Sequence, residues 1–335
     1  MATGPDGARR DRPLRLATRG SPLARWQADR VASLLGSGQN GRECEIVVVE
    51  TSGDRWADVP IDQLGGQGAF VVEIQKAVLD GRAQIAVHSA KDLPSVTPEG
   101  LVLACVPERA DPRDALVGTR LADLGPGARV ATGSVRRRAQ LAWLRPDLTF
   151  VELRGNMATR LERAAREGAG VVAVAALERL GLMDRAAEVL QTGTLLPQVA
   201  QGALAVECRA DDEETRELLR LIDDQVAHRA VTAERSFLAE LGGGCTLPVG
   251  ALASPSGARG GPEPGGAVVV PVTDADELWL EGLLASRDGR ILLRRRARGT
   301  DPAELGRRVA ADLLAHGGTA LDDWAPFGDP GSSLP

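Results

Sequence analysis

Apolar and polar segments alternate through the first two hundred residues in a pattern that predicts a β-α-β succession. Leu14 to Thr18 has the composition of a short strand, and Ser21 and Pro22 follow as an N-cap and a first helical position. Apolar residues then recur at helical spacing as far as Gly36. Further strands are predicted at 45–50, 85–87 and 101–106, with a helix between Phe70 and Gly81.

The pattern restarts after Arg113. Residues 129–136 repeat the order seen at 15–21, with a strand, a threonine, a Gly-Ser pair and a helix start. Strands are predicted at 148–153, 171–175 and 203–208, and helices at 157–167, 211–223 and 226–241. We therefore expect two similar α/β lobes around a cleft, each placing a helix N-terminus near its strand ends.

The last hundred residues change character and predict a small α+β domain. Strands are expected at 268–272, 278–285 and 290–297, the last two joined through Asp288 and Gly289, with a helix at 301–316. A Gly/Pro-rich insertion covers 254–266. Residues 1–12 and those after Trp324 have the composition of disordered tails.

One polar cluster follows a predicted strand, in the stretch Gln84 to Pro94. The apolar run 85–87 leads directly into His88-Ser89-Ala90-Lys91-Asp92. Ligands of open α/β sheets bind beyond the carboxyl ends of strands, so a hydroxyl, an ammonium and a carboxylate there can serve a reaction. A solvated turn is the alternative. Lys76 and Lys91 are the only lysines among forty basic residues, which favours a specific need for a compact ammonium at Lys91.

Composition excludes several classes of function. The chain of 335 residues is 43% apolar and 26% charged, as in soluble globular proteins, and contains no apolar run of membrane-spanning length. No secretory pattern follows Met1, so we expect a cytoplasmic protein with no membrane partner. The four cysteines are far apart and there are three histidines, so neither disulfides nor a metal site is expected. The net charge of −6 argues against nucleic acid as a partner.

One segment is locally basic. Between Arg136 and Arg166 there are eight arginines and three acidic residues, a local charge of 8 − 3 = +5, while the rest of the chain carries −11. Arg154 and Arg160 bracket a Gly-Asn turn after a strand, where binders of carboxylate or phosphate are placed. A solvated helix face is the alternative for the remaining arginines.

Two glycine-rich loops are candidates for function. Gly242-Gly243-Gly244 precedes Cys245, which makes this thiol a candidate nucleophile, although a lone cysteine is more commonly an apolar filler. The segment 51–69 ends in Gly65-Gly66-Gln67-Gly68 and lacks the Gly-Lys-Ser/Thr ending of a phosphate-binding P-loop. It is interpreted as a mobile lid or a connector.

Together these motifs resemble the porphobilinogen deaminase (hydroxymethylbilane synthase) family over residues 14 to 320. The matching stretches are Ala17-Thr18-Arg19-Gly20-Ser21-Pro22-Leu23-Ala24, Val87-His88-Ser89-Ala90-Lys91-Asp92-Leu93-Pro94, Leu153-Arg154-Gly155-Asn156, Gln201-Gly202-Ala203 and Gly243-Gly244-Cys245. The resemblance implies two lobes like those of periplasmic binding proteins and a third, small α+β domain. It places lobe one at 13–109 and 203–226, lobe two at 110–202 and the third domain at 227–324, with tails at 1–12 and 325–335.

The resemblance also implies the chemistry. Family members join four porphobilinogen units, with loss of ammonia, onto a dipyrromethane cofactor held through a cysteine thioether; Cys245 matches that cysteine. Asp92 matches the catalytic carboxylate, which protonates the leaving amine and then stabilises the cationic azafulvene. The family's cofactor-binding positions are Ser89, Lys91, Asp92, Thr132, Ser134, Arg136, Arg137, Arg154 and Arg160. Those for substrate are Arg19, Ser21, Gln27, Phe70 and Arg154. We expect a monomer.

The chain departs from the family pattern at two positions. Gln67 stands where many relatives have a lid lysine, and Gly133 replaces a hydroxyl residue. Neither position transfers a proton or forms a bond. Two rival functions are a non-catalytic binding protein for a small polycarboxylate, and an enzyme that forms a Schiff base at Lys91.

Overall fold

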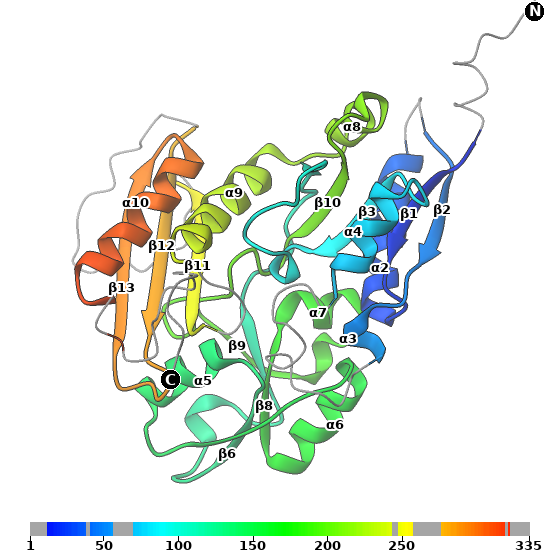
Figure 1. Cartoon of the computed structure of the whole chain (residues 1–335). Coiled ribbons are helices and arrows are strands. Elements are labelled where there is room, and N and C mark those ends of the chain that lie inside the picture. Colours follow the sequence, from blue (N-terminus) through cyan, green and yellow to red (C-terminus); the bar gives the residue numbers. More distant parts are fainter. Residues whose placement is uncertain are drawn as a thin grey trace, which may run out of the picture. The chain divides into compact units, whose positions relative to one another are not determined.

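The computed structural model describes residues 12–37, 41–55, 70–242, 247–256, 276–318 and 321 (Figure 1). The chain divides into two compact units. Unit 1 comprises residues 1–112, 175–183 and 201–228, and unit 2 comprises residues 113–174, 184–200 and 229–335. The described part contains three sheets, one in unit 1 and two in unit 2.

The sheet of unit 1 has the strand order β2-β1-β3-β10-β4. Its strands are β1 (Leu14–Thr18), β2 (Cys44–Val48), β3 (Ile85–Ser89), β4 (Leu101–Cys105) and β10 (Leu204–Arg209). β1 is parallel to both β2 and β3, whereas β10 runs antiparallel to β3 and β4. A strand from after residue 200 therefore lies between two strands from the first 105 residues.

Both faces of this sheet are covered, which explains why its strands have continuous apolar sequences. Leu16 and Val87 pack on one face against Val31 of α2 (Pro22–Gly36). On the other face, Ala86 packs against Ile74 of α4 (Val72–Leu79). The remaining helices of this unit are α3 (Ser52–Arg55), the 3-10 turn η1 (Ala90–Asp92), α7 (Val174–Arg179, within this unit from Ala175) and α8 (Glu213–Arg220).

The first sheet of unit 2 has the order β7-β6-β8-β5-β9. Its strands are β5 (Asp114–Val117), β6 (Arg129–Ala131), β7 (Thr149–Val151), β8 (Ala169–Ala173) and β9 (Ala186–Leu190). Three parallel strands are again followed by an antiparallel one, so the expected likeness of the two lobes is confirmed. Its helices are α5 (Val135–Leu144), α6 (Met157–Glu167) and the 3-10 turns η2 (Leu121–Asp123) and η3 (Met183–Arg185).

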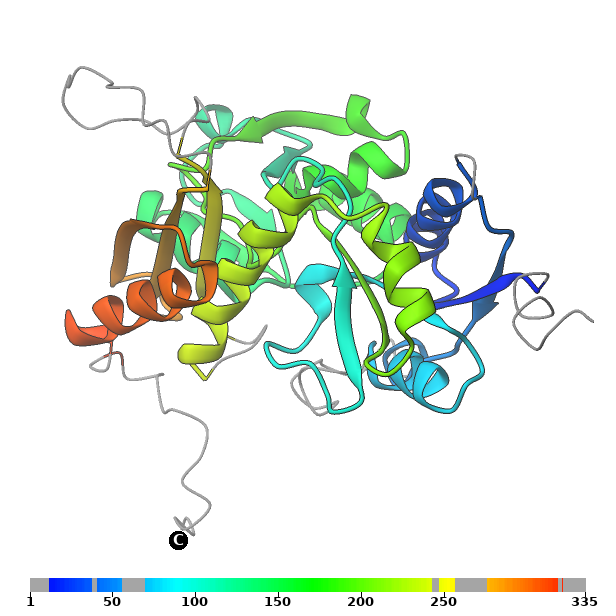
Figure 2. The ribbon, with the colours of Figure 1, turned by 90° about the horizontal axis from the view of Figure 1, so that it is seen from above.

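The second sheet of unit 2 is antiparallel, in the order β11-β12-β13. It consists of β11 (Val249–Pro255), β12 (Leu278–Ala285) and β13 (Leu292–Gly299), with α9 (Gln225–Glu240) and α10 (Pro302–Ala315) beside it. Figure 2 shows α10 (orange to red) lying along these strands. Phe237 of α9 and Val309 of α10 both meet Gly282 of β12, where a Cβ would lie 2.6 Å and 2.9 Å from their side chains. The predicted class, two α/β lobes plus a small α+β domain, is confirmed.

Capping residues place the helix starts as predicted. Ser21 accepts a hydrogen bond from the N–H of Ala24, and Asp301 accepts one from the N–H of Glu304. The sequence pattern does not predict β5, β9 or β11. The strand expected at 268–272 and the two tails, apart from Arg12, lie outside the described residues. The domain bounds inferred from the family resemblance remain a prediction.

Within the described ranges, no helix combines the length and apolar character needed to span a membrane.

The contact between α9, α10 and β12 generates a stability prediction. Phe237 is fully buried, so Phe237→Ala removes a large apolar side chain and leaves a cavity. Such truncations cost about 3–5 kcal/mol, and we expect a marked fall in the urea midpoint of unfolding followed by circular dichroism. Leu221→Ala is the control because Leu221 is 72% exposed. Equal midpoints for the two variants would contradict this packing.

Candidate active site

Two strand ends of unit 1 meet at one edge of its sheet. β1 and β3 are parallel neighbours, so the residues following Thr18 and those following Ser89 emerge on the same side. After β1, Ser21 caps α2 with an Oγ to N distance of 3.3 Å to Ala24. After β3, the chain turns through η1, which ends at Asp92, and Pro94 follows. This edge therefore combines the N-terminus of a 15-residue helix with a half-buried carboxylate.

A pocket of about 50 Å³ lies at this edge. Six residues predicted to bind substrate or cofactor line it, namely Arg19, Ser21, Gln27, Phe70, Ser89 and Asp92. The Arg19 guanidinium stacks on the Phe70 ring with its Cζ 4.0 Å from the centroid. Gln27, which is buried, donates from Nε2 to Ser89 Oγ at 2.7 Å. The structure thus brings together residues that are up to 73 positions apart in the sequence, from Arg19 to Asp92.

Lys91 is turned to a neighbouring loop. Its Nζ donates to Oε1 of Gln201 at 3.4 Å, and Gln201 in turn donates from Nε2 to the carbonyl of Pro112 at 2.7 Å. Arg109 donates from Nε to the Gln201 carbonyl at 3.0 Å. Gln201 is fully buried. The Gln201-Gly202-Ala203 motif therefore orients the ammonium that precedes Asp92.

Arg179 is a basic residue of unit 1 that sequence reasoning missed. It donates from its guanidinium to the carbonyl of Gly202 at 2.6 Å and lies over the Trp26 ring. Burial lowers the pKa of Arg179 to about 10. Its sequence setting is an ordinary helix end, Glu178-Arg179-Leu180, so no local pattern distinguishes it from a solvated arginine.

In unit 2, the predicted hydroxyl residues act as caps at the start of α5. Thr132 Oγ1 accepts a hydrogen bond from the N–H of Ser134 at 3.2 Å. Ser134 Oγ accepts one from the N–H of Arg137 at 3.4 Å. Between them, a Cβ on Gly133 would lie 2.8 Å from the Leu153 carbonyl oxygen and 2.9 Å from a Glu152 oxygen. Glycine therefore fits this close approach of two loops, which explains the departure from the family pattern.

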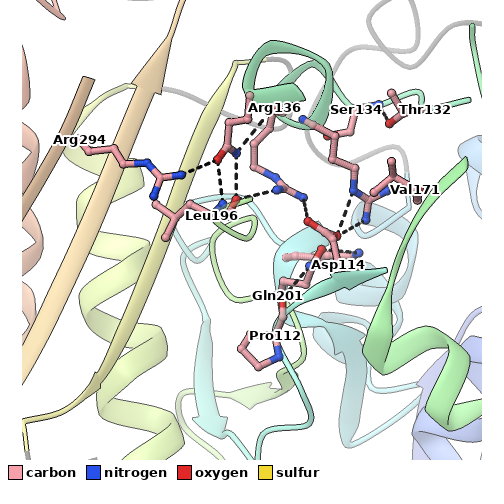
Figure 3. A network of polar contacts seen from close by, with 12 residues as sticks. Pro112, Asp114, Thr132, Ser134, Arg136, Val171, Leu196, Gln201 and Arg294 are labelled. Carbon is pink, nitrogen blue, oxygen red and sulfur yellow. Dashed lines mark hydrogen bonds and ion pairs between the residues drawn. The ribbon is translucent and has the colours of Figure 1, made fainter. Parts of the chain in front are cut away.

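Arg136 and Arg137 share the buried carboxylate of Asp114 (Figure 3). Arg136 donates to Asp114 Oδ2 at 2.8 Å and to the Leu196 carbonyl at 2.6 Å. Arg137 donates to Asp114 Oδ1 from Nε and from one terminal nitrogen, at 3.1 and 2.7 Å, and to the Val171 carbonyl at 2.8 Å. Burial lowers the pKa of Arg136, and the Asp114 charge opposes that shift. Sequence reasoning missed Asp114.

Arg136 and Arg137 share one carboxylate, so their cluster has two positive charges for one negative charge. It is buried, since Arg136 is 3% and Arg137 7% exposed. Arg136 also keeps a buried Nε that has no hydrogen-bond partner among the described residues. Excess buried positive charge is costly without an anion. The charge and the orphaned donor therefore fit a ligand that carries carboxylates.

Arg154 and Arg160 lie at the N-terminus of α6, where Asn156 caps the helix through the N–H of Thr159. Arg154 Nε donates to Glu152 Oε1 at 3.0 Å, and Arg160 Nε donates to the Gly155 carbonyl at 2.8 Å. Both residues are half-buried. An anionic ligand at this helix start would compete with Glu152 and gain the helix dipole.

Three cysteines are poorly suited to nucleophilic chemistry. Burial raises the pKa of the Cys208 thiol to about 11 and raises that of Cys105 further still. Burial also raises the pKa of Cys44. Cys245 and Gln67 lie outside the described residues. Among residues that are described, no group of three or more histidine, cysteine and carboxylate side chains could hold a metal ion.

Comparison with known proteins covers nearly the whole chain. The family model "Porphobilinogen deaminase, dipyromethane cofactor binding domain" matches residues 14–217, and "Porphobilinogen deaminase, C-terminal domain" matches residues 228–315. A porphobilinogen deaminase of Roseiflexus sp. (strain RS-1) is 48% identical over 91% of this chain and 97% of the relative. One from Acidothermus cellulolyticus is 44% identical, over 92% of this chain and 90% of the relative.

Solved structures give a weaker likeness. The ancestral cationic amino acid solute binding protein AncCDT-1 has a TM-score of 0.39 and 15% identity, over 65% of this chain and 91% of that one. The family models and the relatives, in contrast, agree along the length of the sequence. The chain belongs to the porphobilinogen deaminase family.

Proposed function

We propose that the pocket of unit 1 is where this chain binds porphobilinogen, and that Asp92 is its catalytic acid. The reaction follows from the family: the chain is a transferase that condenses four porphobilinogen molecules, releases ammonia and forms the linear tetrapyrrole hydroxymethylbilane, in porphyrin biosynthesis. Its relatives, all named deaminases, do not favour the alternative of a non-catalytic polycarboxylate-binding protein.

The proposal is supported by one pocket that contains both hydrogen-bond donors for the substrate's carboxylates and a carboxylate for its aminomethyl group. Arg19, Ser21 and Gln27 present donors suited to the acetate and propionate of the substrate, and Ser89 adds a hydroxyl. Asp92 is the carboxylate lining the same pocket. A substrate held by its carboxylates would therefore direct its aminomethyl group to Asp92. Substrate entry requires the stacked Arg19 and Phe70 to separate, since the pocket holds about 50 Å³.

Asp92 then performs two tasks in turn. As an acid it gives a proton to the departing amine, and as a carboxylate it faces the cation that remains on the substrate. Lys91, held by Gln201, contributes a fixed positive charge next to it in sequence. Phe70 covers the pocket and excludes water. Schiff-base chemistry at Lys91 is not supported, because its ammonium is engaged with a side-chain amide.

The family's dipyrromethane cofactor supplies, when bound, the pyrrole carbon to which the first substrate unit is joined. We propose that Cys245 holds it covalently and that basic and hydroxyl groups bind its carboxylates. In unit 2 these are Thr132, Ser134, Arg136, Arg137, Arg154 and Arg160, and in unit 1 they are Ser89 and Lys91. Asp92, also a cofactor-binding residue, faces the pyrrole N–H groups instead of the carboxylates. The excess of buried arginine over Asp114 supports this assignment. Arg154 also binds carboxylates of the growing chain.

We further propose that the chain works as a monomer in the cytoplasm, without nucleic-acid or membrane partners. The net charge of −6 supports the exclusion of nucleic acid. The domain bounds proposed from the family pattern are 13–109 with 203–226, then 110–202, then 227–324.

Asp92→Asn tests the catalytic assignment. The substitution keeps size and hydrogen bonding but removes both proton and charge, so we expect turnover to fall by at least about a hundredfold in an assay of ammonia release. Asp92→Glu preserves the chemistry and shifts only the geometry, so it should retain more activity. An Asp92→Asn enzyme with more than about a tenth of the wild-type rate would exclude Asp92 as the acid.

The mass of the purified protein tests the role of Cys245. The protein should weigh more than its sequence by one dipyrromethane, and the added mass should map to the peptide containing Cys245. Cys245→Ser should have the bare sequence mass. Active protein with a free Cys245 thiol would refute the attachment.

Alkylation tests the predicted low reactivity of the two buried thiols, Cys105 and Cys208. A thiol with a raised pKa forms its reactive thiolate only as the pH rises toward that pKa. Native protein treated with iodoacetamide at about pH 8 should therefore leave Cys105 and Cys208 unlabelled, and labelling of Cys208 should increase toward pH 11. Denatured protein serves as the control for full labelling. Fast labelling of either buried thiol at pH 8 would contradict their predicted inertness.

A further inference from the structure

Three buried polar side chains lie on one face of the unit 1 sheet, next to the substrate pocket. His88 of β3 is 4% exposed, Glu207 of β10 is fully buried, and Gln75 of α4 is 4% exposed. In the antiparallel register His88 pairs with Ala205, so Glu207 is two residues along the partner strand and shares its face. The proposed roles of Asp92, Arg19 and Ser89 make no use of this cluster.

Glu207 is the centre of the cluster. Gln75 donates from Nε2 toward both of its carboxylate oxygens, at 3.2 and 2.9 Å. His88 Nε2 lies 3.3 Å from Glu207 Oε2. It forms no hydrogen bond of good geometry with any of the described residues. A carboxylate can only accept, and a buried nitrogen beside it is satisfied when it carries a proton directed at that oxygen. Glu207 therefore favours the imidazole tautomer protonated at Nε2.

With Nε2 beside Glu207, Nδ1 is the ring nitrogen that remains for a ligand, and the tautomer determines whether it donates or accepts. In a neutral imidazole with a proton on Nε2, Nδ1 is an acceptor. His88 lines the pocket together with Asp92 and Arg19. Arg19 is a donor suited to carboxylates, whereas Nδ1 is suited to an N–H group. Porphobilinogen has such groups on its pyrrole ring and its aminomethyl arm.

We propose that His88 contacts the substrate, accepting through Nδ1 a hydrogen bond from an N–H group of porphobilinogen, and that Glu207 and Gln75 are positioning residues that fix its tautomer and ring orientation. The proposal rests on the pocket of unit 1 being the substrate site. It gives a role in recognition to the buried pair of His88 and Glu207.

Two substitutions of His88 separate the two ring nitrogens. An asparagine places its amide atoms at the position of Nδ1 and loses the group near Glu207. A glutamine reaches the position of Nε2 and loses the acceptor in the pocket. We expect His88→Gln to raise KM for porphobilinogen by about tenfold, the effect of one buried hydrogen bond, and His88→Asn to raise it by less. His316→Gln is the control because His316 is exposed and is the C-cap residue of α10, in unit 2.

Glu207→Leu tests the positioning role. Leucine is similar in size but accepts no hydrogen bond, so Nε2 loses the acceptor that favours its proton. A glutamine would be a weaker test, because Gln75 donates to Oε2 at 2.9 Å and would keep an oxygen beside His88. KM should rise in Glu207→Leu, because Nδ1 is no longer kept as an acceptor. The chain has three histidines, so the imidazole ¹⁵N spectrum at about pH 8 can be assigned by substitution. It should show His88 protonated at Nε2 in the wild type and no longer held in that tautomer in Glu207→Leu.

Two results would overturn the proposal. One is a wild-type His88 protonated at Nδ1. The other is a normal KM in His88→Gln with lower thermal stability in His88→Asn, which would mean that only the contact with Glu207 matters. Asp92→Asn in the same assay distinguishes this failure from a failure of the proposed function. If the pocket is not the substrate site, Asp92→Asn keeps its activity; if only the role of His88 is wrong, Asp92→Asn loses activity while KM is unchanged in the His88 variants.

Discussion

Ionised side chains taken out of water must find partners, and this constraint organises both lobes. In unit 1, the Glu207 carboxylate lies in the middle of a sheet and is held by Gln75 and approached by His88. In unit 2, Asp114 at the start of β5 is held by the guanidinium groups of Arg136 and Arg137. Burying a charge without such partners costs several kcal/mol. Each carboxylate therefore fixes the side chains around it.

The two clusters differ in the sign of their excess charge. The cluster around Asp114 has two guanidinium groups for one carboxylate, which suits a ligand with several carboxylates. A further contact extends it toward the third sheet, because Arg294 of β13 donates to Gln140 at 3.2 Å and Gln140 accepts from the Leu196 N–H (Figure 3). The arginines that we propose as cofactor binders are thereby connected, within unit 2, to the domain that continues from the Cys245 loop.

Local signals in the sequence suffice for part of this picture. Ser21 with Pro22, and Asp301 with Pro302, place helix starts because capping depends on neighbouring residues alone. The strand β3 and the polar turn after it can also be predicted. A short apolar run followed by polar residues and Pro94 favours a strand that ends before the proline. These segments give the strand-end edge and, with the family resemblance, most of the residues that line the pocket.

Contacts between distant segments could not be predicted in this way. β5, β9 and β11 are short or mixed in polarity, and they are strands because an antiparallel neighbour pairs with them. Asp114 and Glu207 look like ordinary acidic residues in the sequence; only the fold shows them to be buried beside Arg137 and His88. The packing around Gly133 is equally non-local, since it involves the Leu153 carbonyl.

The most direct test of the account is the mass of the purified protein after mixing with a limiting amount of porphobilinogen. Stepwise condensation on a covalent primer predicts a ladder of protein species, each heavier than the last by one deaminated substrate unit, with one ammonia released for each step. Release of ammonia with no change in protein mass would contradict the account.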